Sequence, residues 1–310
     1  MGKSDVTRDI RSSDKWVNAG MPLPITVLIA VKNEEKNLPK CLRALSFSSS
    51  VVLLDSESTD KTGDIAKEFG AEVVQFKYGG GYPKKRQWAM QNLGIATPWT
   101  LLIDADEVVP PQLADEIRTA IERPDFDAYF ITKGFHFLGR RFRFGGFSHR
   151  AVLLFRTGKA RFERLFDDER NGLDMEVHER ILVDGSIGLL DTPLIHEDFK
   201  GLEAYIDRHN KYSTWEAHLR FRYVQSGNYG LKSVRPRLFG NSQEQRRFLK
   251  MLIVRLPMEP VVWFIYHFVF RLGFLEGHRG LIACKFRAAY IAQVRAKMFE
   301  LKLRAAATDF

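Results

Sequence analysis

Apolar runs and amphipathic stretches alternate along the first 125 residues of the 310-residue chain. The run at 25–31 is continuous and rich in β-branched residues, as expected of a strand that is buried on both faces. Further apolar runs lie at 51–54, 71–76 and 99–104, and helices are predicted at 38–45, 59–69, 83–93 and 110–122. Strands and helices that alternate at this spacing predict an α/β fold with a mostly parallel sheet flanked by helices.

The alternation fades after residue 127. Short strands are predicted at 128–132, 151–155, 177–183 and 188–190, and an amphipathic helix at 201–224. Beyond Gly227 the chain becomes basic, aromatic and interrupted by prolines. We therefore predict a polar N-terminal arm, an α/β domain in two halves and a helical C-terminal region, with the bounds 1–23, 24–226 (24–127 and 128–226) and 227–310.

Two aspartates, Asp104 and Asp106, follow the apolar run at 99–104, with Ala105 between them. The alternation of side chains along a strand places both carboxylates on one face. Open α/β sheets bind ligands at the carboxyl ends of their strands, and a carboxylate pair there can hold Mg²⁺ against a diphosphate. The alternative is a strand end followed by an acidic helix start, with the helix beginning at Pro110–Pro111.

Asp55 ends the apolar run at 51–54, so three acidic residues mark strand ends of one predicted sheet. Helix capping explains the polar residues that follow, since Ser58 or Thr59 can N-cap the next helix and Asp60 suits its first turn. Capping does not explain Asp55, whose carboxylate we expect to be free to accept from a nucleobase N–H or a ribose hydroxyl. The three acids together favour a nucleotide–metal site.

Positive charge is concentrated towards the C-terminal end. The net charge is +9, and residues 232–304 contain fifteen Lys and Arg against four Asp and Glu, a balance of +11. This favours an anionic partner for that region, either a membrane surface or a nucleic acid. Cys41 and Cys284 form no disulfide or metal pattern, and the first twenty residues lack the apolar core of a signal peptide, so we expect a cytoplasmic protein.

Four motifs resemble those of the family 2 glycosyltransferases in order and spacing: Val27–Asn37, Val52–Thr62, Lys84–Ala89 and Leu102–Glu107. Three later stretches are similar to a subgroup that contains the lipopolysaccharide-core β-glucosyltransferases and relatives in surface-polysaccharide assembly: Val177–Arg180, Pro193–His196 and Gly273–Gly277. The resemblance spans about residues 24–300. It implies a GT-A (Rossmann-like) fold that uses nucleotide-diphosphate sugars, with a donor half at 24–127 and an acceptor half at 128–226.

The resemblance also implies roles for individual residues. The donor contacts would be the backbone of Ala30 and Val31 at the base, Glu34 near the ribose, Asp55 on the uracil edge, Lys85 or Arg86 at the diphosphate, and Asp104 on the sugar or ribose. Asp106 would coordinate a divalent metal, Mg²⁺ or Mn²⁺, and His196 would complete its binding. Without the family, His196 is more simply a structural histidine.

The implied reaction inverts the sugar in a single displacement. The metal would stabilise the departing diphosphate, and Lys85 or Arg86 would assist as a fixed positive charge. A carboxylate must remove the proton of the attacking hydroxyl. Glu179 is the candidate base, with Asp174 and Glu176 in reserve; the alternative is that Glu179 forms a surface ion pair with a basic residue.

Two segments indicate contact with an anionic partner. Residues 128–162 contain no acid and interleave arginines with phenylalanines. Stacking of the phenylalanines on nucleic-acid bases is one interpretation. We expect instead that the phenylalanines lie in the core or face a membrane, that some arginines bind phosphates of the acceptor, and that Gly145–Gly146 forms a mobile loop. At 256–275 and 281–303, basic residues lie among aromatic and aliphatic ones, a pattern typical of helices that lie in a membrane interface without crossing it. The alternative is a hairpin packed on its own domain or in a homo-oligomer.

The sequence therefore predicts an inverting, metal-dependent glycosyltransferase, peripheral on the inner face of the cytoplasmic membrane. It would transfer a sugar, with UDP-glucose the expected donor, to a lipid-linked or lipopolysaccharide-type acceptor, and no nucleic acid would be bound. A sugar nucleotidyltransferase is the second hypothesis, but it expects a Gly-rich phosphate loop where Lys32–Glu35 stands. A non-catalytic membrane or nucleic-acid binding protein is the third, and it leaves the three aspartates unexplained.

Overall fold

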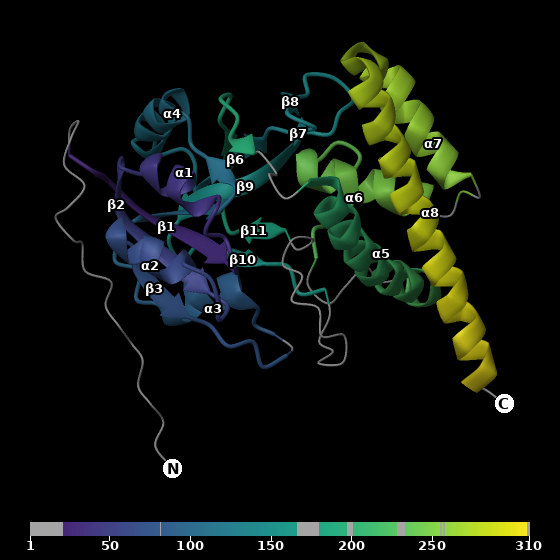
Figure 1. Cartoon of the computed structure of the whole chain (residues 1–310), viewed down its shortest axis with the longest axis horizontal. Coiled ribbons are helices and arrows are strands. Elements are labelled where there is room, and N and C mark those ends of the chain that lie inside the picture. Colours follow the sequence, from purple (N-terminus) through teal and green to yellow (C-terminus); the bar gives the residue numbers. More distant parts are fainter. Residues whose placement is uncertain are drawn as a thin grey trace. The chain divides into compact units, whose positions relative to one another are not determined.

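The chain forms two compact units, drawn in Figure 1. The computed structural model describes residues 21–80, 82–165, 180–196, 201–227, 233–254, 256 and 258–308. The first unit, here called the sheet unit, comprises Met1–Lys133, Arg150–Phe162 and Ile181–His196. The second, here called the helical unit, comprises Gly134–His149, Glu163–Arg180 and Glu197–Phe310.

A seven-stranded sheet forms the centre of the sheet unit, in the order β12-β6-β9-β4-β1-β2-β3. Its strands are β1 (Leu23–Val31), β2 (Ser48–Asp55), β3 (Glu72–Gln75), β4 (Trp99–Asp104), β6 (Ala128–Lys133), β9 (His149–Arg156) and β12 (Ile187–Leu189). Parallel pairing joins β1 to β2 and β4, β2 to β3, and β12 to β6, whereas β9 runs antiparallel to β4. The mostly parallel sheet predicted from the sequence is confirmed.

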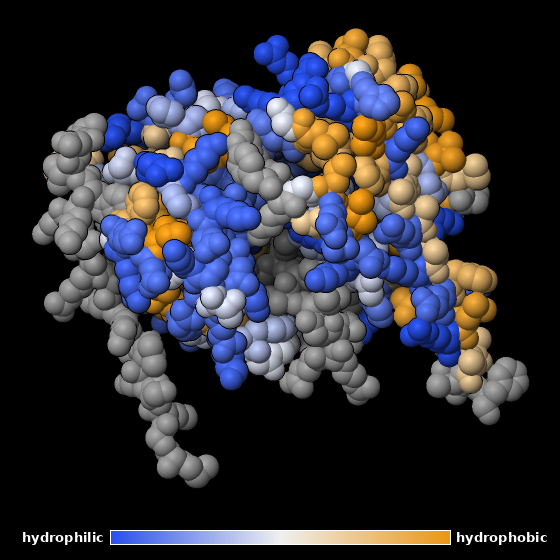
Figure 2. All heavy atoms as spheres, in the orientation of Figure 1, coloured by the Kyte–Doolittle hydropathy of each residue, from blue (hydrophilic) through white to orange (hydrophobic). Residues whose placement is uncertain are grey.

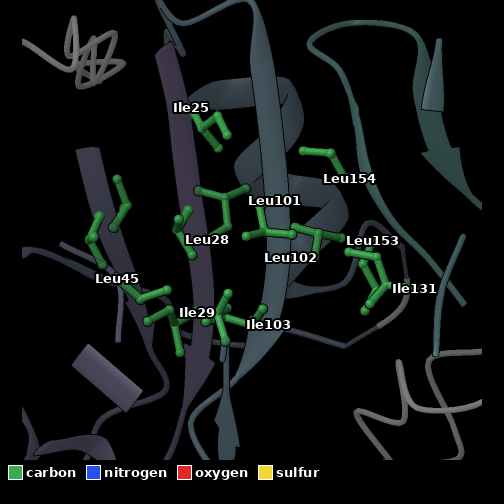
Figure 3. Packing of buried hydrophobic residues seen from close by; sticks show 14 of the residues in the cluster. Ile25, Leu28, Ile29, Leu45, Leu101, Leu102, Ile103, Ile131, Leu153 and Leu154 are labelled. Carbon is green, nitrogen blue, oxygen red and sulfur yellow. The ribbon is translucent and has the colours of Figure 1, made fainter. Parts of the chain in front are cut away.

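The central strands are continuous apolar runs because both of their faces are covered. Figure 3 shows side chains of β1 packed beside those of β4, among them Ile25, Leu28, Ile29, Leu101, Leu102 and Ile103. The flanking helices are α1 (Leu38–Arg43), α2 (Thr62–Glu68), α3 (Lys85–Asn92) and α4 (Pro111–Ile121). The prediction that Ser58 or Thr59 caps α2 was wrong: Asp60 accepts from the backbone N–H and hydroxyl of Thr62, and the helix begins there.

Three short antiparallel pairs complete the strands. In the sheet unit, β5 (Glu107–Val108) pairs with β13 (Ile195–His196), and β10 (Ala160–Phe162) pairs with β11 (Ile181–Val183). In the helical unit, β7 (His136–Phe137) pairs with β8 (Arg140–Arg141). The β5–β13 pair matters for the site, because it brings residue 196 beside residue 107.

Helices make up most of the helical unit: α5 (Gly201–Ser226), α6 (Ser242–Ile253), α7 (Glu259–Ile265), a π-helical turn η3 (Tyr266–Phe270), a 3₁₀ turn η4 (Gly273–Glu276) and α8 (Gly277–Thr308). The predicted boundary at 226 separates α5 from this region, but the compact units group them together. The reason is that Ala217 of α5 packs against Tyr290, Ile291 and Val294 of α8. Within the described ranges, none of the helices has the length and apolar character that a membrane crossing needs.

A buried ion network joins three of these helices. Arg220 of α5 is 1% exposed and lies 2.6 Å from a Glu216 oxygen and 2.7 Å from a Glu259 oxygen. The hydroxyl of Tyr290 on α8 donates to Glu216 at 2.6 Å. Because each buried charge has an opposite charge in contact, α5, α7 and α8 can bury these groups without leaving one unpaired.

Candidate active site

The register of the sheet brings the predicted strand-end acids to one edge. Val31 of β1 lies beside Asp55 of β2, and Ala30 lies beside Asp104 of β4. Asp106 lies two residues beyond Asp104, the last residue of β4. Carboxyl ends of parallel strands are where open α/β sheets bind their ligands, so the three carboxylates occupy the edge at which a nucleotide would be expected.

Asp104 lies between two cations. Its Oδ1 accepts from the guanidinium of Arg86, in the first turn of α3, and its Oδ2 accepts from Lys133 Nζ, at the end of β6, at 2.8 Å. The side chain remains 34% exposed. Burial alone would raise the pKa of Asp104, but the charges of Lys133 and Arg86 outweigh it and hold the pKa well below its usual range. Asp104 is therefore an ionised carboxylate with both oxygens engaged.

Glu107 and Lys133 complete this cluster, although neither was among the predicted site residues. Glu107 is fully buried; one oxygen accepts from the backbone N–H of Asp104 at 2.8 Å, and the other lies 2.7 Å from Lys133 Nζ. Burial raises the pKa of Glu107, although the charge of Lys133 opposes that rise. Glu107 closes the sequence motif of Asp104 and Asp106, so its position was visible, whereas Lys133 gave no local signal.

Asp106 and His196 face each other across the β5–β13 pair. The His196 Nε2 atom lies 3.1 Å from Asp106 Oδ2. Burial lowers the pKa of His196, but the hydrogen bond to Asp106 and the charges of Asp106 and Glu107 outweigh burial, and the pKa is raised overall. The sequence prediction named these two residues as metal ligands, and the structure brings them into contact.

The spacing of this pair fits a small divalent cation. Two neighbouring ligands of an octahedral Mg²⁺, each at about 2.1 Å, lie about 3.0 Å apart, which matches the separation of these two atoms. Over the described ranges, no group of three His, Cys, Asp or Glu residues is arranged to hold a metal. A cation held by only two protein ligands takes its remaining ligands from water and phosphate oxygens, as Mg²⁺ commonly does.

Asp55 has partners within the protein. Its Oδ1 accepts from the backbone N–H of Ser58 at 3.1 Å and from the Ser58 hydroxyl, and its Oδ2 accepts from Gln75 Nε2 at 2.9 Å. The expectation that this carboxylate is free was therefore wrong, because it closes the turn after β2. A carboxylate has about four acceptor positions, so contact of Asp55 with a base remains a prediction.

Lys85 is buried and ties α3 to the ends of two strands. Its Nζ donates to the Val31 carbonyl at 3.1 Å and to the Ser56 hydroxyl at 2.7 Å. Of the two cations predicted for a diphosphate, Lys85 therefore lies against β1 and β2, whereas Arg86 lies on Asp104. Their roles toward a diphosphate remain predictions.

The loop after β1 is fixed to the loop after β2. Asn33 N–H donates to the Ser58 hydroxyl at 2.9 Å, and Glu34 N–H donates to the Thr62 hydroxyl at 2.8 Å. The Glu34 side chain accepts from Asn37 at 3.0 Å. Glu34 thus sits at the same sheet edge as the aspartates, next to the β1 end formed by Ala30 and Val31, and its ribose contact remains a prediction.

The candidate base lies outside the described residues. Glu179, Asp174 and Glu176 all fall in 166–179, between the described ranges that end at 165 and resume at 180. Their roles therefore remain predictions from the sequence.

Several known proteins are similar to this chain. Among solved structures, the mannosyltransferase PcManGT from Pyrobaculum calidifontis in complex with GDP-Man and Mn²⁺ has a TM-score of 0.48, with 14% identity over 92% of each chain. The S. aureus TarS 1-349 in complex with UDP-GlcNAc has a TM-score of 0.44, with 15% identity over 91% of this chain and 92% of that chain. The lipopolysaccharide core biosynthesis glycosyltransferase LpsC of Rhizobium meliloti (strain 1021) is 27% identical over 286 residues, 90% of this chain and 93% of that protein. Residues 26–175 match the model of glycosyl transferase family 2. The chain is therefore similar to glycosyl transferase family 2 over residues 26–175.

Proposed function

We propose that this glycosyltransferase inverts the sugar it transfers, takes it from a nucleotide-diphosphate donor, UDP-glucose, and adds it to a lipid-linked or lipopolysaccharide-type saccharide. The observation that carries the proposal is the meeting of Asp104, Asp106 and His196 at the carboxyl edge of the sheet, with Arg86 and Lys133 beside them. Similarity to a lipopolysaccharide core biosynthesis glycosyltransferase along 90% of the chain supports the class of acceptor. Similarity to glycosyl transferase family 2 over residues 26–175 argues against the nucleotidyltransferase and the non-catalytic hypotheses.

The side chains at the sheet edge would have different roles that follow from their charges. Asp106 and His196 would hold Mg²⁺ or Mn²⁺, which when bound supplies Lewis-acid stabilisation of the leaving diphosphate. Asp104, kept ionised by its two cations, would accept hydrogen bonds from hydroxyl groups of the sugar or ribose. Because Lys133 and Arg86 are held in place before any ligand arrives, their charges need little reorganisation in the transition state.

Inversion requires a carboxylate on the acceptor side of the sugar. We assign Glu179 as the base that removes the proton of the acceptor hydroxyl, with Asp174 and Glu176 as the alternatives. Glu179→Gln should therefore lower kcat by about a hundredfold or more while UDP affinity stays unchanged, since general base catalysis contributes about 10²–10⁴-fold. Loss of UDP binding in this variant would show that Glu179 supports the donor site instead.

A lipid-linked acceptor also sets the location of the enzyme. We propose that it works on the inner face of the cytoplasmic membrane as a peripheral protein. The support is the balance of +11 over residues 232–304, which an anionic leaflet would attract.

Calorimetric titration with UDP, with and without Mn²⁺, tests the donor site. The parent chain should bind UDP more tightly with Mn²⁺, and Asp106→Ala should lose the metal-dependent part. Asp115→Ala is the matched control, because Asp115 is an exposed aspartate on α4 of the same unit. If the parent chain binds no nucleoside diphosphate, with or without metal, the proposed function is wrong.

A further inference from the structure

The helical unit exposes a continuous apolar surface on α7, η3 and η4, here called the apolar apex. Its side chains include Val261, Ile265, Val269, Phe270, Phe274 and Leu275, and Phe270 is 74% exposed. Figure 2 shows hydrophobic side chains gathered over α7 and the adjoining part of α8. Exposed apolar residues that are contiguous, rather than scattered singly, mark an interaction surface.

The apex segment buries its two acids and its histidine and exposes many of its apolar side chains. Glu259, His267 and Glu276 are 1%, 6% and 2% exposed, although they lie in the same short stretch as the exposed Phe270. The His267 Nδ1 atom lies 2.6 Å from the Gly145 carbonyl oxygen, and burial lowers its pKa to about 4, so this histidine is neutral at physiological pH. A water-facing helix normally shows the opposite arrangement. The outer face of the apex is therefore suited to a non-aqueous partner.

Arginines of β8 and of the segment that follows it border the apex. Arg140 is 51% exposed, and Arg141 and Arg143 are also exposed. Glu276 of η4 fixes the segment after β8, because one of its oxygens accepts from the backbone N–H groups of Arg143 at 2.6 Å and of Phe144 at 2.8 Å. The other Glu276 oxygen lies 3.4 Å from an Arg140 nitrogen, so this carboxylate is used internally, and the side chains of Arg141 and Arg143 remain on the outside.

Within the segments that form the apex and its border, every exposed charge is positive. In the described ranges 134–149 and 258–299, the only acidic residues are Glu259 and Glu276, and both are buried. Arg271 and Arg279, which flank η4, are exposed. An apolar centre with a basic rim matches the two parts of an anionic bilayer surface, where acyl chains lie beneath phosphate groups.

We propose that the apolar apex and the arginines around it form a docking surface for an anionic lipid bilayer. The exposed apolar side chains would enter the boundary between headgroups and acyl chains, and the arginines would contact lipid phosphates, which the guanidinium group suits. A second copy of the chain fits less well, because a two-fold dimer places the same basic patch on itself. The inference deepens the peripheral location proposed above, and its test does not require catalysis.

Cosedimentation of the full chain with vesicles tests the docking surface. The parent should bind vesicles of equimolar phosphatidylglycerol and phosphatidylcholine and leave pure phosphatidylcholine vesicles largely unbound. Phe270→Asp should weaken binding at least tenfold, whereas Phe299→Asp, at a 62% exposed position on α8, should not. Arg141→Ser should weaken binding about fivefold, the effect of about 1 kcal/mol per basic residue, and Lys302→Ser should not.

Three outcomes would overturn the proposal. One is equal loss of binding in Phe270→Asp and Phe299→Asp, and another is equal binding to neutral and anionic vesicles. The third is a parent dimer that Phe270→Asp converts to a monomer while vesicle binding is unchanged, since the apex would then be a subunit interface. UDP titration of the same variants separates the two proposals: a chain that binds vesicles but not UDP removes the proposed function and keeps the docking surface.

Discussion

Replacing Lys133 with methionine should destabilise the sheet unit, because Lys133 is the cation shared by Asp104 and Glu107. Methionine keeps much of the volume of the lysine stem and removes only the charge. Leaving one buried partner of an ion pair uncompensated costs about 3–5 kcal/mol. Fully buried Glu107 carries most of this loss. Asp104 is 34% exposed and keeps Arg86, so solvent screening limits its share to about 0.5 kcal/mol. We expect a loss of about 3 kcal/mol in the free energy of unfolding at about pH 8.

The loss should shrink on acidification. Burial already raises the pKa of Glu107 in the folded chain, and removing the Lys133 charge raises it further. A carboxyl group whose pKa is higher in the folded chain than in the unfolded chain favours folding when it is protonated. Its contribution to stability is complete below the unfolded pKa, about 4.3 for glutamate. That contribution is lost as the pH rises through the folded pKa. The variant should therefore be closest to the parent at about pH 5 and furthest from it at about pH 8.

Urea unfolding of the full chain, followed by tryptophan fluorescence, measures the effect. Lys159→Met is the control, because Lys159 is an exposed lysine of the same unit. The double variant Lys133→Met with Glu107→Gln should recover more than half of the loss, since no buried charge remains and the glutamine oxygen can still accept from the backbone at Asp104. The reasoning is refuted if Lys133→Met is no less stable than Lys159→Met at about pH 8, or if the double variant is less stable than the single one.

Three further predictions concern other parts of the structure. Arg220→Met should lower the thermal midpoint and cost about 3 kcal/mol, because the buried Glu259 carboxylate keeps only weaker partners; an unchanged midpoint would contradict this. Gly280→Ala should also lower the midpoint, although alanine favours helices by about 1 kcal/mol, because its Cβ would clash with the Gly273 carbonyl oxygen; a rise in calorimetry would argue against that contact. Mn²⁺-dependent UDP binding should weaken on acidification at a higher pH than for an ordinary histidine, because proton and metal compete for His196, whose pKa is raised; a flat titration between about pH 8 and about pH 5 would rule out His196 as a ligand.

The sheet and its acidic edge were predictable from the sequence for a physical reason. A parallel strand buried on both faces needs an unbroken apolar run, and such runs locate β1, β2 and β4 to within a few residues. Parallel strands also end at a common edge, so the meeting of Asp104 and Asp106 with the ends of neighbouring strands follows from their position alone. The contact of Asp106 with His196 came from the family resemblance and not from the strand pattern.

Other features depended on contacts between distant segments. Lys133 reaches Asp104 only because β6 lies two places from β4 in the sheet, with the antiparallel β9 between them, an order that no local pattern specifies. The partners of Asp55 include Gln75 on another strand, so the motif around Asp55 could not show that its carboxylate is engaged. The amphipathic pattern at 256–275 was visible, but not that its acid, Glu259, is buried while many of its apolar side chains are exposed.

The two cations on Asp104 also bear on the order in which ligands arrive. A carboxylate already flanked by Arg86 and Lys133 attracts a bare divalent ion only weakly, since like charges repel it. A phosphate chain has the opposite effect, because the positive charges of the same two side chains attract it. A metal ion already chelated by the nucleotide brings its own positive charge together with the negative charge of the phosphates. We therefore expect the enzyme to bind its donor as a preformed metal–nucleotide complex and to bind the free cation only weakly before the nucleotide.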